Sequence, residues 1–175
     1  MLVRLIFDPP SPGSWNMAVD EALLSTCDET VQTTLRVYSW SAATLSLGYF
    51  QPHALRCQHH SSSSCDIVRR ATGGGAIVHH HEMTYSFVTP VRDRNSRETQ
   101  AWYDVLHQSL RATLAKFDVE ATPCEQTDRS REDRFLCFER RSAGDILFED
   151  RKIAGSAQRR QKRAVLQHGS LLFRQ

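Results

Sequence analysis

The 175-residue sequence lacks long apolar runs, cysteine pairs at CxxC spacing and a strong excess of charge. No apolar stretch approaches the roughly 18 residues that a membrane-spanning helix needs. The five cysteines are odd in number and lack metal-ligand spacing, which argues against a disulfide framework or a zinc site. A net charge of +2 does not point to nucleic acid. We therefore expect a cytoplasmic protein with free thiols, with no membrane and no nucleic-acid partner.

Two signatures of nucleotide binding are also missing. A Walker loop ends in Gly-Lys-Ser/Thr and a dinucleotide fingerprint reads GxGxxG, and the glycine triplet at 73–75 fits neither. The triplet follows Arg69 and Arg70 and precedes His79 within "DIVRRATGGGAIVHHHEMTYSF". Glycines let a ligand lie against the main chain, and an arginine can bind an anion through two hydrogen bonds. We predict that the triplet forms the floor of a site for an extended ligand with an anionic head.

The three histidines at 79–81 raise the question of a metal site. On a strand, His79 and His81 share one face and His80 lies on the other. No carboxylate or cysteine at a recognisable spacing completes a ligand set. We therefore expect no metal site.

Most of the chain reads as short strands. They are predicted at residues 2–8, 33–40, 43–50, 66–70, 76–80, 83–90, 145–150, 151–158 and 164–173. Residues 59–66 and 123–134 are predicted to be polar loops. Strands and helices do not alternate strictly, so the sequence predicts one α+β domain over residues 1–175, with a mixed β-sheet flanked by helices.

Two helices are predicted, at 14–27 and 96–118. Ser14 is the expected N-cap of the first, whose apolar face we assign to Ala18, Ala22 and Leu23. The second has apolar residues at spacings of three and four, namely Trp102, Leu106, Leu110, Leu114 and Phe117.

Two further positions are candidates for chemistry. Lys152 precedes a run of small residues that permits close approach of a ligand, and a lysine beside an acyl carbonyl or phosphate stabilises negative charge. Taken alone, however, a lysine is more often a surface residue. Cys137 lies between apolar residues with arginines nearby, which favours a reactive thiolate, although a cysteine beside phenylalanine is more often inert packing. The segment 151–175 has seven Lys or Arg and no acid, so it is either a surface for an acidic partner or a solvated basic face.

Four ordered segments resemble the lipoate–biotin protein ligase superfamily, in its lipoate-protein ligase and octanoyltransferase branch. They are "NMAVDEALL", "RVYSWSAATLSLGYFQ", "RRATGGGAIVHHHEMTYS" and "GDILFEDRKIAGSAQRRQKRAVLQHGSLL". The resemblance covers nearly the whole chain except the loops at 52–64 and 119–134. The "GRGR"-type loop of the biotin branch is absent, which argues against a biotin ligase.

The resemblance implies a lipoate–biotin protein ligase-like catalytic domain that attaches an octanoyl or lipoyl group to a lysine. The implied acceptors are lipoyl domains of 2-oxoacid dehydrogenase complexes or glycine cleavage H protein, and the implied donor partner is acyl carrier protein. The implied catalytic residues are Cys137 and Lys152. The implied substrate-binding residues are Arg70, Gly73, Gly74, Gly75 and His79 on one wall, and Gly155, Ser156, Ala157, His168 and Gly169 on the other.

The branch contains two mechanisms. Cysteine-dependent octanoyltransferases take the acyl group from acyl carrier protein through a thioester and need no cofactor, and Cys137 lies where that subgroup has its nucleophile. Thioester exchange onto a thiolate is nearly isoenergetic, which explains why a cysteine suits this route. The alternative is a ligase that uses ATP and Mg to form lipoyl-adenylate, and a second alternative is a non-catalytic acyl-binding module. We favour the transferase.

The sequence departs from the family pattern in two places. Ala42-Ala43 replaces a pair of prolines, and the chain stops at Gln175, short of the family's full catalytic domain. We therefore expect a domain truncated at its C-terminus, with an uncovered strand edge in the segment 151–175.

Overall fold

The computed structural model describes residues 2–92 and 96–173. The elements are β1 (Val3–Phe7), α1 (Gly13–Thr30), β2 (Thr33–Tyr38), β3 (Thr44–Leu47), β4 (Asp66–Arg69), β5 (Ile77–His79), β6 (Met83–Pro90), α2 (Ser96–Ala115), β7 (Thr122–Pro123), β8 (Ile146–Phe148), β9 (Arg151–Gln161) and β10 (Ala164–Leu171). Four 3-10 turns cover His53–Gln58, His60–Ser62, Arg129–Arg131 and Cys137–Glu139. The first two lie in or beside the loop predicted at 59–66, and the third lies in the loop predicted at 123–134.

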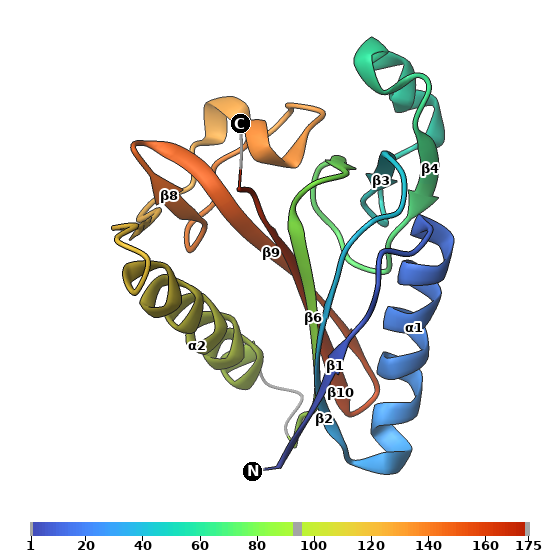
Figure 1. Cartoon of the computed structure of the whole chain (residues 1–175), viewed down its shortest axis with the longest axis vertical. Helices are drawn as coiled ribbons and strands as arrows, with labels where there is room; N and C mark the ends of the chain where they lie inside the picture. Colours follow the sequence, from blue (N-terminus) through green and yellow to red (C-terminus); the bar gives the residue numbers. More distant parts are fainter. Residues whose placement is uncertain (1, 93–95, 174–175) are drawn as a thin grey trace.

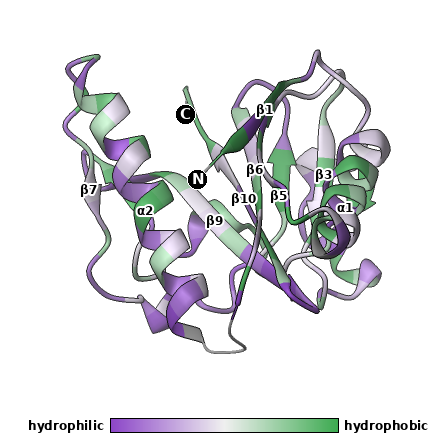
Figure 2. Ribbon diagram, turned by 90° about the horizontal axis from the view of Figure 1, so that it is seen from below, coloured by the Kyte–Doolittle hydropathy of each residue, from purple (hydrophilic) through white to green (hydrophobic). Residues whose placement is uncertain are grey.

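The described strands form a large sheet of order β1-β2-β6-β10-β9-β8-β7 and a small sheet of order β4-β3-β5. Both are mixed: β1 runs parallel to β2 and β4 parallel to β3, while the other pairs are antiparallel. Helices α1 and α2 lie on opposite sides of the large sheet (Figures 1 and 2). The prediction of an α+β fold with a mixed sheet flanked by helices is confirmed. Neither helix is apolar enough over a sufficient length to cross a bilayer, among the residues described.

The start of α1 differs from the prediction. Its first residue is Gly13, and Pro12 occupies the N-cap position without a side-chain hydrogen bond. Ser14 therefore lies inside the first turn, and its assignment as N-cap is wrong. Proline fixes φ near the value that a helix start needs, so the chain enters the helix before the serine.

The buried face of α1 is also different. Ala18 and Ala22 are exposed, whereas Asn16 and Asp20 are buried against the sheet. Both accept hydrogen bonds from the buried Arg36 of β2, at 2.9 Å each. Leu23, the third predicted residue, is partly buried and packs against the hydrophobic core, so the prediction is right for Leu23 and wrong for the two alanines. Hydrophobicity alone did not reveal that the inward face also carries polar residues paired with a buried arginine.

The second helix follows the prediction over most of its length. The ring of Trp102 packs 5.2 Å from that of Phe87 on β6, centroid to centroid. The helix ends at Ala115, and Phe117, predicted on the apolar face, is 74% exposed. Asp118 then adopts a positive φ of 59°, which turns the chain away before another helical turn can bury Phe117.

The strands of the basic segment lie in the middle of the large sheet. β10 pairs with both β6 and β9, and β9 also pairs with β8. β8 and β7, which precede this segment in the chain, continue the sheet beside residues 151–154 of β9, so the expected uncovered edge is wrong for that part and for β10. Among the strands described, residues 155–161 of β9 pair with β10 on one side only, and the expected edge lies there. β10 is paired on both sides along its length and β9 over residues 151–154, which gives a rigid base for side chains that form a site.

Candidate active site

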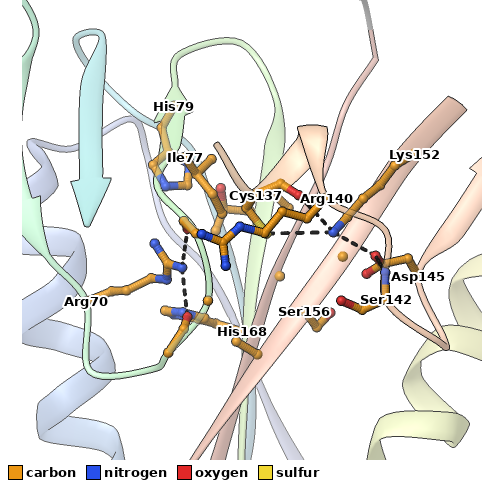
Figure 3. A pocket seen from close by; sticks show the side chains of 18 of the residues that line it. Arg70, Ile77, His79, Cys137, Arg140, Ser142, Asp145, Lys152, Ser156 and His168 are labelled. Atoms are coloured by element: carbon orange, nitrogen blue, oxygen red, sulfur yellow. Dashed lines mark hydrogen bonds and ion pairs between the residues drawn. The ribbon is translucent and has the colours of Figure 1, made fainter. Parts of the chain in front are cut away.

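The site residues named from the sequence line one cavity of about 140 Å³. Figure 3 shows the cavity with Arg70 on one side and Lys152 and Asp145 on the other. All twelve take part: Arg70, Gly73, Gly74, Gly75, His79, Cys137, Lys152, Gly155, Ser156, Ala157, His168 and Gly169. Segments far apart in the sequence thus meet at one place, while their roles toward a substrate stay predictions.

Cys137 begins a 3-10 turn that is held against the glycine loop (residues 73–75). Its N–H donates to Ala76 O at 2.7 Å, and the N–H of Ala76 donates to Phe135 O at 2.9 Å. The Nζ atom of Lys152 lies 3.7 Å from Cys137 Sγ and donates to Cys137 O at 3.2 Å. A thiol and a lysine ammonium therefore face each other within the cavity.

Lys152 is not a surface residue. It is 6% exposed, and its Nζ forms an ion pair of 2.8 Å with Oδ2 of the buried Asp145. The same carboxylate oxygen accepts from the N–H of Ser142 at 2.7 Å. A buried ammonium needs such a partner, since an unpaired charge in a protein interior is strongly destabilising. The alternative that left Lys152 in solvent is therefore wrong.

Gly155 leaves room for this ion pair. A Cβ atom there would lie 2.6 Å from Lys152 Cε, 2.9 Å from Lys152 Nζ and 2.9 Å from Asp145 Oδ1. These separations are far below van der Waals contact, so both charged groups would have to move. The absence of a side chain at Gly155 thus makes room for Lys152 and Asp145, in addition to any ligand.

We predict that Gly155→Ala lowers the free energy of unfolding by about 1–3 kcal/mol, as expected for overpacking. Denaturant unfolding measures it. Gly73→Ala is the matched control, because its Cβ would meet only the ring of Phe50, at 3.8 Å. The control is expected to change stability by no more than about 1 kcal/mol. Equal effects at the two positions would contradict the crowding argument.

Arg70 holds the glycine loop in shape. Its guanidinium is 2% exposed and donates to Gly73 O at 2.8 Å, Gly75 O at 2.6 Å and Ser46 O at 3.1 Å. Burial lowers the pKa of Arg70 to about 10, with the nearby Arg140 acting in the same direction and Cys137 opposing it. In the described chain, the N–H groups of residues 73–75 have no hydrogen-bond partner. The loop therefore presents main-chain donors beside the cavity, while Arg70 fixes its carbonyls.

His79 is committed to neighbours inside the protein. Its Nδ1 lies 2.5 Å from Glu82 Oε1, its Nε2 lies 2.8 Å from Ser46 Oγ, and its ring stacks 3.9 Å from that of Trp40. Burial lowers the pKa of His79, against the raising effect of Glu82. Within residues 2–92 and 96–173, no three His, Cys, Asp or Glu side chains are grouped as metal ligands.

His168 joins the cavity to the buried cluster under α1. Its Nε2 lies 2.5 Å from Thr72 Oγ1, and its Nδ1 lies 3.3 Å from Asp20 Oδ2. Burial raises the pKa of Asp20, but the bond to His168 and the charges of His168 and Arg36 outweigh it and lower the pKa overall. In the sequence, the signal for this buried cluster was the pair Asn16 and Asp20, which lie four residues apart in "NMAVDEALL" and therefore on one face of the helix.

The sequence interpretation missed several residues that line the same cavity. They are Met17, Tyr38, Trp40, Ile77, Thr84, Tyr103, Arg140, Ser142, Asp145 and Ser170. Arg140 follows Cys137 by three residues within the arginine-rich segment already noted. Asp145 had a weaker signal: it immediately precedes β8, which pairs with the strand that carries Lys152.

Known proteins match this chain over most of its length. The family model for the lipoyl protein ligase A/B catalytic domain matches residues 12–175. Octanoyltransferase LipM of Staphylococcus aureus is 38% identical over 169 residues, which cover 90% of this chain and 61% of that protein. LipM of Geobacillus kaustophilus is 37% identical over 183 residues, covering 97% and 65% of the two chains. The chain thus spans about three-fifths of the length of the curated relatives that it matches.

Solved structures share the fold. A Thermoplasma acidophilum structure described as a lipoate protein ligase with bound lipoic acid superposes with a TM-score of 0.80 at 22% identity, covering 100% of this chain and 70% of that one. A lipoate-protein ligase A bound with ATP gives a TM-score of 0.75 at 22% identity, covering 100% and 68%. The match of the family model over residues 12–175 shows that the protein belongs to the lipoyl protein ligase A/B catalytic domain family.

Proposed function

We propose that this protein transfers an octanoyl group from acyl carrier protein to a lysine of a lipoyl domain, through a thioester on Cys137. The observation that carries the proposal is the position of Cys137 Sγ, 3.7 Å from the buried ammonium of Lys152 in the shared cavity. The names of the LipM relatives support the same activity.

The first step loads the cysteine. The thiolate of Cys137 attacks the carbonyl carbon of the octanoyl thioester, a new C–S bond forms, and the thiolate of the carrier's arm leaves. One thioester replaces another, so the exchange is nearly balanced in free energy and requires no ATP. The hydrogen bond from Lys152 to the sulfur is strongest when the sulfur is anionic, which stabilises the attacking form.

Both tetrahedral transition states carry negative charge on the former carbonyl oxygen. Lys152 and the N–H groups of the glycine loop (residues 73–75) are among the donors that line the cavity and could stabilise it. The N–H of Cys137 is not available, because it donates to Ala76 O. Donors fixed before the reaction lower the barrier because they need no reorganisation as the charge develops.

The second step forms the product. The amine of the acceptor lysine, after losing one proton, attacks the octanoyl carbon; the C–N bond forms and the C–S bond to Cys137 breaks. The second amine proton balances the charge on the departing thiolate, so the free thiol is restored. We propose that the acceptors are lipoyl domains of 2-oxoacid dehydrogenase complexes or glycine cleavage H protein, in the cytoplasm. A related fold, with a TM-score of 0.71 and 21% identity, is described as a bipartite lipoate protein ligase studied with its E2 lipoyl domain.

Steady-state assays with two donors test the proposal. We expect octanoylation of a lipoyl domain from octanoyl-acyl carrier protein without added nucleotide, and no dependence on ATP or Mg. Turnover only with free octanoate or lipoate, ATP and Mg would establish the ligase alternative instead. Binding of octanoate without turnover under either condition would indicate the non-catalytic module.

A further inference from the structure

A chain of hydrogen bonds runs from the cavity into the interface between α2 and the large sheet. Ser156 Oγ lies 2.7 Å from His107 Nε2, and His107 Nδ1 lies 2.6 Å from the carbonyl oxygen of Gly144. On its other side Ser156 Oγ lies 2.6 Å from the hydroxyl of Tyr85, which accepts from Gln167 Nε2 at 3.2 Å. His107 is 5% exposed, and Ser156 lines the cavity.

The direction of each bond follows from its ends. The carbonyl of Gly144 only accepts, so Nδ1 of His107 carries the donated proton. In a neutral imidazole, Nε2 is then an acceptor, and Ser156 must donate its hydroxyl proton to it. The Ser156 oxygen accepts in turn from Tyr85, whose own oxygen accepts from Gln167. The hydroxyl of Ser156 therefore connects the accepting nitrogen of His107, Nε2, to the cavity.

The imidazole is held in this orientation. Gly144, with a φ of +89°, packs directly against Tyr103, because a Cβ there would lie 2.8 Å from Tyr103 Cε1. The ring of Tyr103 lies 4.2 Å from that of His107, centroid to centroid. A hydroxyl bonded to a histidine whose other nitrogen is fixed by a third group is the arrangement that proteins use to move a proton.

We propose that His107, acting through Ser156, receives the proton that the acceptor lysine must lose before it attacks the octanoyl group on Cys137. This inference rests on the proposed function. The ammonium gives its proton to Ser156 Oγ while the Ser156 hydroxyl proton moves to His107 Nε2, so the serine stays neutral and the histidine becomes charged. His107 later releases that proton to solvent. Ser156 is the group that contacts the substrate, and His107 is a positioning residue that acts through it.

The charges around His107 are compatible with this role. Asp104 and Tyr103 are on α2, Asp145 precedes β8, Lys152 is on β9 and Tyr85 is on β6. Burial lowers the pKa of His107, and Lys152 acts in the same direction, while the bond to Gly144 and the charges of Asp145 and Asp104 oppose them. The ring is therefore neutral at neutral pH. Aminolysis is expected to slow as the pH falls through that pKa, because a protonated ring accepts no further proton.

The test measures two half-reactions separately in the His107→Gln variant: loading of Cys137 with octanoyl, and transfer of octanoyl from Cys137 to the lipoyl domain. Glutamine can still accept the Ser156 hydrogen bond but cannot take up a proton. We expect normal octanoylation of Cys137 from octanoyl-acyl carrier protein, transfer to the lipoyl domain slowed about 100-fold or more, and loss of the acid limb of its pH profile. His53→Gln is the matched control and should leave both steps unchanged, because His53 is exposed and does not line the cavity.

Two results would overturn the inference: wild-type transfer by folded His107→Gln, or equal slowing of both half-reactions, which indicates a purely structural role. If His107→Gln does not fold, Ser156→Ala decides by the same comparison, since it removes the intervening hydroxyl. Failure of the proposed function looks different, because the unaltered protein would then acquire no octanoyl group on Cys137.

Discussion

Cys137→Ser is expected to abolish octanoyl transfer while leaving the fold intact. Loss of an enzyme's covalent nucleophile costs up to about a millionfold in rate, so we expect a decrease of at least about 1,000-fold. Cys137 is half-buried, and sulfur to oxygen is a small change in volume, so the free energy of unfolding should change by about 1 kcal/mol or less. Transfer from octanoyl-acyl carrier protein and denaturant unfolding measure the two effects.

Cys57→Ser is the matched control for that substitution. Cys57 is an exposed free cysteine in the turn His53–Gln58 and does not line the cavity. The Cys57→Ser variant should retain full transfer activity. Activity retained by Cys137→Ser would show that the acyl group does not pass through this sulfur, and activity lost equally in both variants would point to a general effect of removing a thiol.

Lys152→Ala has two expected effects, one on rate and one on stability. Loss of the ammonium removes a donor to the transition-state oxygen, which costs about 100-fold or more, or roughly 3 kcal/mol. It also leaves Asp145 buried without its partner, and breaking a buried ion pair costs about 3–5 kcal/mol of folding free energy. Lys152→Arg should rescue activity poorly, because the space beside Gly155 is already filled by the lysine. Single-turnover rates and denaturant unfolding report on each effect.

A second substitution separates the two effects. In Lys152→Ala/Asp145→Asn no carboxylate is left unpaired, so most of the lost stability should return while the rate stays low. Lys116→Ala, an exposed lysine beyond α2, should change stability by no more than about 0.5 kcal/mol and leave transfer unchanged. Recovery of both rate and stability in the double variant would show that Lys152 matters only for folding.

The central part of the site was predictable because its signals are local. The glycine triplet, the small residues after Lys152 and the cysteine among arginines each stand within a short segment, and the structure brings all of them to one cavity. The strands that carry them were also recognised, because β-branched and aromatic residues between turn residues are a short-range pattern. The order of the strands in the sheet was not predicted, since no local pattern shows that β8 pairs beside β9.

The partners of these residues could not be predicted in the same way. Asp145 pairs with Lys152, and His107 with Ser156, across elements whose relative register no local pattern specifies. The inward face of α1 was misassigned in part, at Ala18 and Ala22, for a related reason. In the sequence, Asn16 and Asp20 look like surface residues. Only the fold shows that they are buried and hydrogen-bonded to Arg36 on β2. Polar residues that are buried in pairs carry no hydrophobic period, so only the folded arrangement reveals them.

Intact-mass measurement of the protein after incubation with octanoyl-acyl carrier protein, without nucleotide, tests the central claim most directly. The account predicts one octanoyl adduct, located on Cys137 by peptide mapping and released by hydroxylamine. Added lipoyl domain should then remove the adduct and gain the octanoyl group on its lysine. Octanoylation of the lipoyl domain with no adduct ever formed on Cys137, or only when free octanoate and ATP are supplied, would contradict it.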